Sequence, residues 1–366
     1  MSKKIVIIPT FCESHLIKYQ IPNIIDTIDP DYIIYNEGMF PNGTEGNKTI
    51  TQKWKDEYTL NGEGMRGFDY LELKKIIKDS QKKYVNTKII LNEMEYLMGM
   101  SSTDCYVAAT TNFKDFGIDI KEGDYIFPYE GDVFHHEDSK KEIQNYMDQL
   151  EPGQGFRSIW IDYMQNFWYV EMSRIKPYLA DKKHHHPGNH MSRRICVRYK
   201  DGSFYREMLE NFMTTNYIDP SEGYGMLHPT DLITYHYAWI RPGKFKQFRC
   251  DQLERWPGYW DVFKHGLDKV NEYKYNEVLV RPDLQHLTKG YIKFFDKFPH
   301  PKHIKEHEDW TEMTDDDRSK LRKCSDVYAP KEIKYIYQPF ANAETKIIDL
   351  NTINRDRVVE VLESLK

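Results

Sequence analysis

The sequence has few cysteines, no long apolar run and no excess of positive charge. Its five cysteines are widely spaced and form no CxxC pair, which predicts a reducing, intracellular compartment rather than a disulfide framework. No apolar run approaches the roughly 20 residues that cross a bilayer, and the first ten residues are too strand-like for a signal peptide. We therefore expect a cytoplasmic protein without a transmembrane segment. A net charge of −6 argues against sequence-independent binding of nucleic acid.

Alternating patterns in the first 150 of the 366 residues predict an α/β fold. The β-branched run Ile5 to Ile8 is typical of a strand buried on both faces. Further strands are expected at residues 31–38, 87–94 and 125–128. Helices are expected at residues 14–27, 70–84 and 140–150. Strands that alternate with helices favour a mainly parallel sheet flanked by helices.

Three details of these helices follow from the residue pattern. Pro22 lies where it would break or restart the first helix. The second helix is expected to turn Leu71, Ile76 and Ile77 inward. Ser139 is expected to be the N-cap of the third, with Glu142 three residues later completing a capping box.

The stretch FPYEGDVFHHED, residues 127–138, contains the most concentrated set of polar groups that could carry chemistry. Glu130 and Asp132 are two residues apart, so their side chains share a face if the segment is extended, and Gly131 leaves space for a ligand. Two carboxylates after a buried strand suit Mg²⁺ or Mn²⁺ held against phosphates. The alternative is that both are solvated turn residues, or that one caps the next helix.

These residues carry a resemblance to a known family. EGDYIFPYEGDVF resembles the strand and Asp-x-Asp metal motif of GT-A-fold, family 2-like nucleotide-sugar glycosyltransferases, and IVIIPTFCES resembles that family's first strand and nucleotide loop. The resemblance covers residues 4–140 best and extends more weakly to 250. It implies a GT-A-like catalytic domain at 1–250, with a nucleotide-sugar half at 1–140 and an acceptor half at 141–250. Residues 251–366 would be a helical or irregular extension packed on it.

The resemblance also implies which residues bind the donor. Thr10, Glu13, Glu37 and Arg66 would lie at the nucleotide, and Glu130 and Asp132 at the metal and diphosphate. The sequence departs from the family where Glu130 replaces the usual first Asp and where Val133 replaces a third acidic residue. In addition, roughly fifty residues separate GMRG from GDYIF, which is longer than usual.

Histidines offer further metal ligands. A His beyond the central sheet often completes the metal site in the resembling family; His236 is the best match and His228 the second, while a buried, hydrogen-bonded His236 is the alternative. At most one of His135 and His136 could join a shared site, because adjacent side chains in an extended loop diverge. The three histidines at 184–186 are poorly placed to converge on one ion.

A transferase also needs a carboxylate that takes the proton of the acceptor hydroxyl. The candidates are Asp162, Glu171, Glu207 and Asp231. Asp162 and Glu171 are favoured because they flank aromatic residues that would either stack on sugars or form core, namely Tyr163, Phe167, Trp168 and Tyr169. Four basic residues could meet phosphates or be surface residues, namely Arg193, Arg194, Arg241 and Lys244.

Three functions remain open from the sequence. The first is a metal-dependent glycosyltransferase that moves a hexose or pentose from a nucleotide-diphosphate sugar to a glycan or lipid carrier. The second is a glycosyltransferase acting on a hydroxylated nucleic-acid base or a protein, favoured by the basic and aromatic runs SRRICVRYK and RPGKFKQFR. The third is a non-catalytic protein that binds nucleotides or carbohydrates. The pattern does not identify the donor, the acceptor or the stereochemistry.

Overall fold

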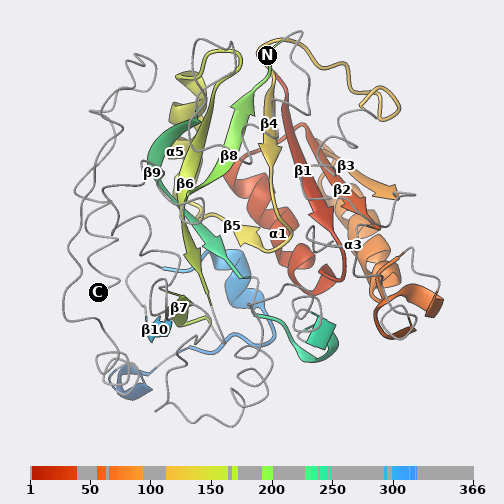
Figure 1. Ribbon diagram of the computed structural model, residues 1–366, viewed down its shortest axis with the longest axis vertical. Helices are drawn as coiled ribbons and strands as arrows, with labels where there is room; N and C mark the ends of the chain where they lie inside the picture. Colours follow the sequence, from red (N-terminus) through yellow and green to blue (C-terminus); the bar gives the residue numbers. More distant parts are fainter. Residues whose placement is uncertain are drawn as a thin grey trace, which may run out of the picture.

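An eight-stranded sheet organises the computed structural model (Figure 1). The structure describes residues 2–38, 56–62, 66–93, 113–163, 167–171, 192–200, 227–237, 240–245, 247–248, 292–294, 299–312, 314–317 and 319. Strand order in the sheet is β3-β2-β1-β4-β8-β6-β9-β5. These strands are β1 (Lys4–Thr10), β2 (Tyr32–Glu37), β3 (Lys88–Glu93), β4 (Tyr125–Pro128), β5 (Val133–Phe134), β6 (Gly155–Asp162), β8 (Ser192–Arg198) and β9 (Leu227–His236).

The sheet is mixed but mainly parallel. Strands β3, β2, β1 and β4 are all parallel, and so are β6 and β9. The antiparallel strand β8 lies between β4 and β6, and β5 pairs antiparallel with β9. A second sheet pairs β7 (Tyr169–Glu171) with β10 (Ile292–Phe294). The predicted α/β class is thus confirmed, and the arrangement is consistent with a GT-A-like fold.

Helices cover one face of the sheet. They are α1 (Ser14–Thr27), α3 (Tyr70–Lys83) and α5 (Ser139–Asp148), with short 3₁₀ turns η1 (Leu60–Gly62) and η4 (Lys302–Glu306). One core cluster joins alternate strand residues such as Val6 and Phe127 to Ile21 of α1, Ile77 of α3 and Met147 of α5. The opposite strand face packs against Phe113 and Ile118, in the segment that precedes β4. Because both faces are covered, the continuous apolar runs predicted for buried strands are present.

Three predicted details of the helices are wrong. Pro22 lies inside α1, which continues without a break. Leu71 is 64% exposed, so its predicted inward position is wrong, whereas Ile77 is buried and Ile76 packs against the core as predicted, together with Leu73. Helix α5 begins at Ser139 itself, so Asp138 is the N-cap, and it makes no side-chain capping hydrogen bond. The predicted capping box with Glu142 is therefore not formed.

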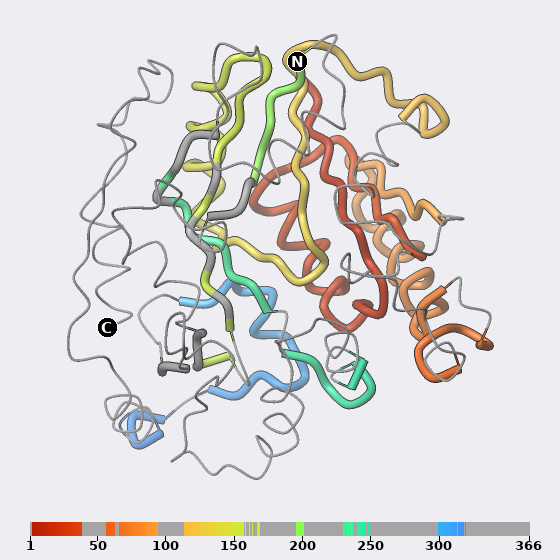
Figure 2. The backbone as a smooth tube through the Cα atoms, in the orientation of Figure 1, coloured from red at the N-terminus to blue at the C-terminus, as the bar shows by residue number. Residues whose placement is uncertain are grey.

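The region after residue 250 is described only in part. Residues 299–312 include η4 and lie against α1 and the end of β9 (Figure 2). The Asp201-Gly202 turn also predicts a hairpin, and the apolar spacing after Asn354 predicts a terminal helix, but both segments lie outside the described residues. The division at residue 250 stays a prediction. Within the described part of the chain, each helix is too short or too polar to span a bilayer.

Candidate functional site

Three potential metal ligands converge at the carboxyl ends of β4 and β9. Glu130 and Asp132 follow β4, and His236 is the last residue of β9. Their ligand atoms all lie within 4.8 Å of one another, and Asp132 and His236 are buried. His236 Nε2 lies 3.2 Å from Asp132 Oδ1 and 3.9 Å from Glu130 Oε2. The sequence placed these three residues in one site, and the structure brings them together.

The donor set fits a hard divalent cation. An ion that binds its ligands at ~2.1 Å holds any two of them within ~4.2 Å of each other, and both distances from His236 Nε2 satisfy this limit. Two carboxylates and one imidazole suit Mg²⁺ or Mn²⁺ with solvent and phosphate oxygens completing the coordination. Asp132 is only 3% exposed, so the reading of this carboxylate as a solvated turn residue is wrong.

A buried arginine adjoins the same carboxylate. Arg241 Nη2 lies 2.9 Å from Asp132 Oδ2 and 3.0 Å from Glu13 Oε1. Burial alone would lower the pKa of the guanidinium, but Glu13 and Asp132 raise it, so Arg241 stays a cation. The interpretation of Arg241 as a surface residue is therefore wrong. The carboxylate of Glu13, which the resemblance placed at the nucleotide, shares Arg241 with Asp132 of the metal group.

Gly131 makes the approach of Glu13 to the metal loop geometrically feasible. A Cβ atom at this position would lie 2.1 Å from Glu13 Oε2 and 3.0 Å from its Cδ. Helix α1 also holds this loop. Its Gln20 Nε2 donates hydrogen bonds to the carbonyl oxygens of Glu130, at 2.6 Å, and Val133, at 3.0 Å. The side chain of Gln20 thus holds the loop, and the space that Gly131 was expected to leave for a ligand is occupied by the Glu13 carboxylate.

A second acidic group lies at the end of β2. Glu37 Oε1 accepts a hydrogen bond from the backbone N–H of Gly67 at 3.0 Å, and Arg66 Nε lies 3.3 Å from Oε2. Burial raises the pKa of the Glu37 carboxyl to about 8, against the lowering effects of Gly67 and Arg66. Thr10 pairs with Glu37 in the β1–β2 register, and its buried hydroxyl has no hydrogen-bond partner among the described residues. Thr10, Glu37 and Arg66, which the resemblance places at the nucleotide, are therefore neighbours in the structure.

Only one of the two favoured proton acceptors lies beside the metal group. Asp162 ends β6 and is the register partner of His236, and the next residue donates its backbone N–H to the carbonyl of His236 at 2.9 Å. Glu171 ends β7 in the separate two-stranded sheet. Glu207 lies outside the described residues, and Asp231 lies within β9, five residues before His236.

The aromatic residues after Asp162 are core rather than a sugar platform. Tyr163, Phe167 and Trp168 are buried, at 0%, 2% and 6% exposure. They form a cluster with Tyr237, His300 and Trp310. Of the two alternatives for these three rings, the core is therefore confirmed and stacking on a sugar is wrong; the side chain of Tyr169 lies outside the described residues.

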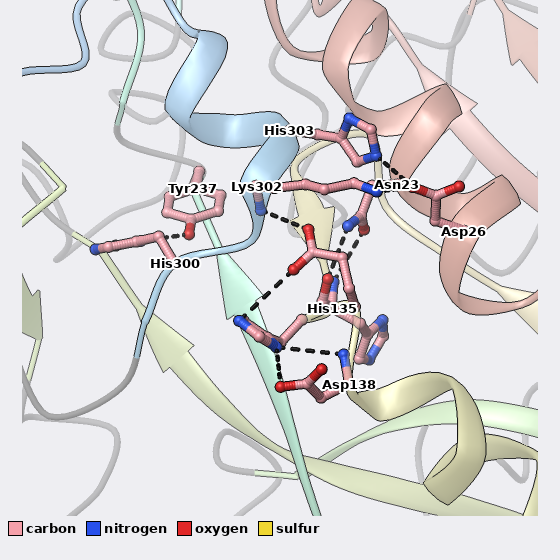
Figure 3. A network of polar contacts seen from close by, with 10 residues as sticks. Asn23, Asp26, His135, Asp138, Tyr237, His300, Lys302 and His303 are labelled. Atoms are coloured by element: carbon pink, nitrogen blue, oxygen red, sulfur yellow. Dashed lines mark hydrogen bonds and ion pairs between the residues drawn. The ribbon is translucent and has the colours of Figure 1, made fainter.

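The cluster ties the segment 299–310 to the site. Tyr237 Oη and His300 Nδ1 are 2.7 Å apart, and Tyr237 donates its backbone N–H to the carbonyl of Asp132 at 2.9 Å. Figure 3 shows the same segment reaching α1, where His303 Nε2 lies 2.8 Å from Asp26 Oδ2. Lys302 donates its backbone N–H to Glu137. Sequence patterns gave no indication of this contact, because the two partners are far apart along the chain.

Two other histidines near the metal loop, His135 and His136, make contacts elsewhere. His135 is buried between Tyr129, at 2.5 Å from Nδ1, and Thr234, at 2.9 Å from Nε2, and burial lowers its pKa to about 3. His136 contacts Glu137 and Asp138. The backbone of His228 is in β9, near the end opposite His236. Residues 184–186 lie outside the described residues.

Two solved structures share weak similarity with this chain. No family model and no curated protein matches it. TarS of S. aureus is 11% identical, with a TM-score of 0.29, over 74% of this chain and 42% of TarS. A mannose-1-phosphate geranyltransferase of Thermus thermophilus is 8% identical, with a TM-score of 0.24, over 74% of this chain and 67% of that one. The chain spans less than half of TarS, and TM-scores this low carry no argument about function.

Proposed function

We propose that the chain is a metal-dependent glycosyltransferase that transfers a sugar from a nucleotide-diphosphate donor to a hydroxyl group of a glycan or lipid carrier. The observation that carries this proposal is the convergence of Glu130, Asp132 and His236 at the sheet edge that also holds Glu13 and Glu37. Ligands bind at this edge in open α/β sheets. A metal group beside polar residues that can bind a nucleoside is what a donor diphosphate requires.

Each group has a distinct task in this proposal. Glu130, Asp132 and His236 would hold Mn²⁺ or Mg²⁺, which when bound neutralises charge on the leaving diphosphate. Glu37 and Arg66 would bind the nucleoside. Asp162 is preferred over Glu171 as the base that takes the acceptor proton, because its backbone is the register partner of His236.

The structure weakens the case for a nucleic-acid acceptor. In SRRICVRYK, Ile195, Cys196 and Val197 are buried in the central strand β8. In RPGKFKQFR, Arg241 pairs with two carboxylates and Phe248 is buried. Neither run therefore presents these residues as a basic stripe to a polynucleotide. We retain a protein or nucleic-acid acceptor only as an outcome of an acceptor screen.

The metal role is tested with Asp132→Asn, which keeps the side-chain volume and removes the charge. We expect a panel of nucleotide-diphosphate sugars with Mn²⁺ to raise the melting temperature of the wild type, since ligands that bind only the folded state stabilise it. Asp132→Asn should lose this metal-dependent shift and donor hydrolysis.

Asp124→Asn is the matched control, because Asp124 is also buried and precedes the opposite end of β4, where it accepts from Lys3 N at 2.7 Å. The control should retain the shift even if its baseline stability falls. A wild type that binds donors but neither hydrolyses nor transfers them would support the non-catalytic alternative. Full retention of binding and hydrolysis in Asp132→Asn would exclude the metal role of Asp132.

A further inference from the structure

Arg241 and the metal group share one carboxylate. Asp132 directs Oδ1 toward His236, at 3.2 Å, and Oδ2 toward Arg241 Nη2, at 2.9 Å. The Arg241 side chain is 1% exposed, and Nη1 also donates to the carbonyl oxygen of Cys12 at 3.4 Å. A cation bound by Asp132 would therefore lie within a few ångströms of a fixed positive charge, in a site with little solvent to screen the repulsion.

The formal charges of the site differ before and after a metal ion binds. Glu13, Glu130 and Asp132 against Arg241 leave a net charge of −2, which a divalent cation would neutralise. A donor diphosphate would then bring new negative charge, and the only cation described within ion-pair distance of Asp132 or Glu13 that is always charged is Arg241. Guanidinium groups match phosphate oxygens with two parallel hydrogen bonds.

The loop after β9 is held in place by aromatic contacts. Phe245 packs 4.2 Å from the ring of His15 and 4.9 Å from that of Phe68, and Phe248 packs 5.6 Å from Phe11. These rings fix the loop four and seven residues beyond Arg241. In the proposal that follows, Arg241 changes partner by rotation of its long side chain while this loop stays packed.

We propose that Arg241 serves as the counterion of the metal site. Before the metal binds, its guanidinium neutralises Asp132 and Glu13; when the metal and the donor bind, the same guanidinium moves to the donor's diphosphate. This inference rests on the proposed function and assigns an order to its ligands. Metal alone competes with Arg241 and binds weakly. The metal and the diphosphate each raise the affinity for the other, because the displaced arginine forms an ion pair with the diphosphate.

The test measures the two binding steps separately. The affinity for Mn²⁺ alone is measured by electron paramagnetic resonance titration. The affinity for pyrophosphate at saturating Mn²⁺ is then measured by calorimetry. Pyrophosphate carries the diphosphate of any donor and needs no knowledge of the nucleoside. Arg241→Met should bind Mn²⁺ alone about tenfold more tightly and pyrophosphate about tenfold more weakly, the change expected for one charge-assisted hydrogen bond. Arg241→Lys, which keeps the charge but not the fork, should bind Mn²⁺ like the wild type and pyrophosphate about threefold more weakly.

Arg198→Met is the matched control. Arg198 is a partly buried arginine at the opposite end of the strands, where it donates to the carbonyl of Leu150, and its loss should change neither affinity. If the wild type binds neither Mn²⁺ nor pyrophosphate, the proposed function itself fails. If the wild type binds both and Arg241→Met binds Mn²⁺ alone no more tightly, only the counterion role is overturned. If Arg241→Met does not fold, an unchanged pyrophosphate affinity in Arg241→Lys would overturn the counterion role.

Discussion

At the scale of single residues, the absence of a side chain at Gly131 is as important as the carboxylates beside it. Gly131→Ala would place a Cβ atom 2.1 Å from Glu13 Oε2. The atom displaced is the end of a flexible side chain, so we expect the free energy of unfolding to change by less than about 1 kcal/mol. The displaced carboxylate would leave the position in which the resemblance places Glu13 at the nucleotide, so nucleotide-diphosphate binding with Mn²⁺ should weaken about tenfold.

A double-mutant cycle with Glu13→Ala isolates this mechanism. Once Glu13 is truncated, the added methyl group has nothing to displace, so Gly131→Ala should have no further effect on binding in that background. Thermal-shift titration of all four proteins measures the coupling. An equal loss from Gly131→Ala in both backgrounds would show that the loop backbone, rather than Glu13, is disturbed.

At the scale of elements, the segment 299–310 braces the end of β9 through a single polar pair inside an aromatic cluster. Tyr237→Phe removes the hydroxyl 2.7 Å from His300 Nδ1 and leaves that nitrogen buried. We expect a loss of about 1 to 2 kcal/mol in unfolding free energy, and faster amide hydrogen exchange in residues 299–310.

Tyr163→Phe is the control for this pair. Tyr163 packs in the same cluster, with its ring 5.0 Å from that of Tyr237, and its hydroxyl has no hydrogen-bond partner among the described residues. Removing that hydroxyl should leave stability and exchange near wild type. Equal effects of the two substitutions would indicate general repacking instead of a specific brace.

At the scale of the whole molecule, two buried neutral histidines make the fold sensitive to acid. Burial lowers the pKa of both His135 and His300 to about 3. Below pH 6.5 the unfolded chain protonates these residues and the folded chain does not, so the stability present above that pH is lost as the pH falls. Each histidine should account for about 2 kcal/mol of lost stability between pH 7 and pH 5.

Urea unfolding at the two pH values measures this loss. His300→Gln should lose about 2 kcal/mol less than the wild type does on the same change of pH. The partly exposed His136, replaced by Gln, serves as the control and should leave the loss unchanged. An identical loss in His300→Gln and the wild type would mean that other groups govern the acid response.

The sequence was most informative where local pattern decides structure. Ile5 to Ile8 predicted β1, and the position of Glu130 and Asp132 after a buried strand, together with the family resemblance, predicted their convergence with His236. Arg241 was ambiguous, because its partner Asp132 is 109 residues away and only packing decides which arginines are buried. Tyr163, Phe167 and Trp168 were left open between core and sugar platform for the same reason: composition does not distinguish an aromatic core from an aromatic surface.

The course of the chain after the metal loop bears on how the fold is completed. Four residues separate β4 from β5, yet β5 pairs with β9, which the chain supplies almost a hundred residues later: Val133 with His236, and Phe134 with Tyr235. The first 140 residues therefore present an unmatched strand until β9 arrives. Closing so long a loop is a late, entropically costly event in folding. Because His236 lies on β9, high metal affinity requires that β9 has paired with β5. Metal binding measured during refolding would therefore show when this pairing occurs.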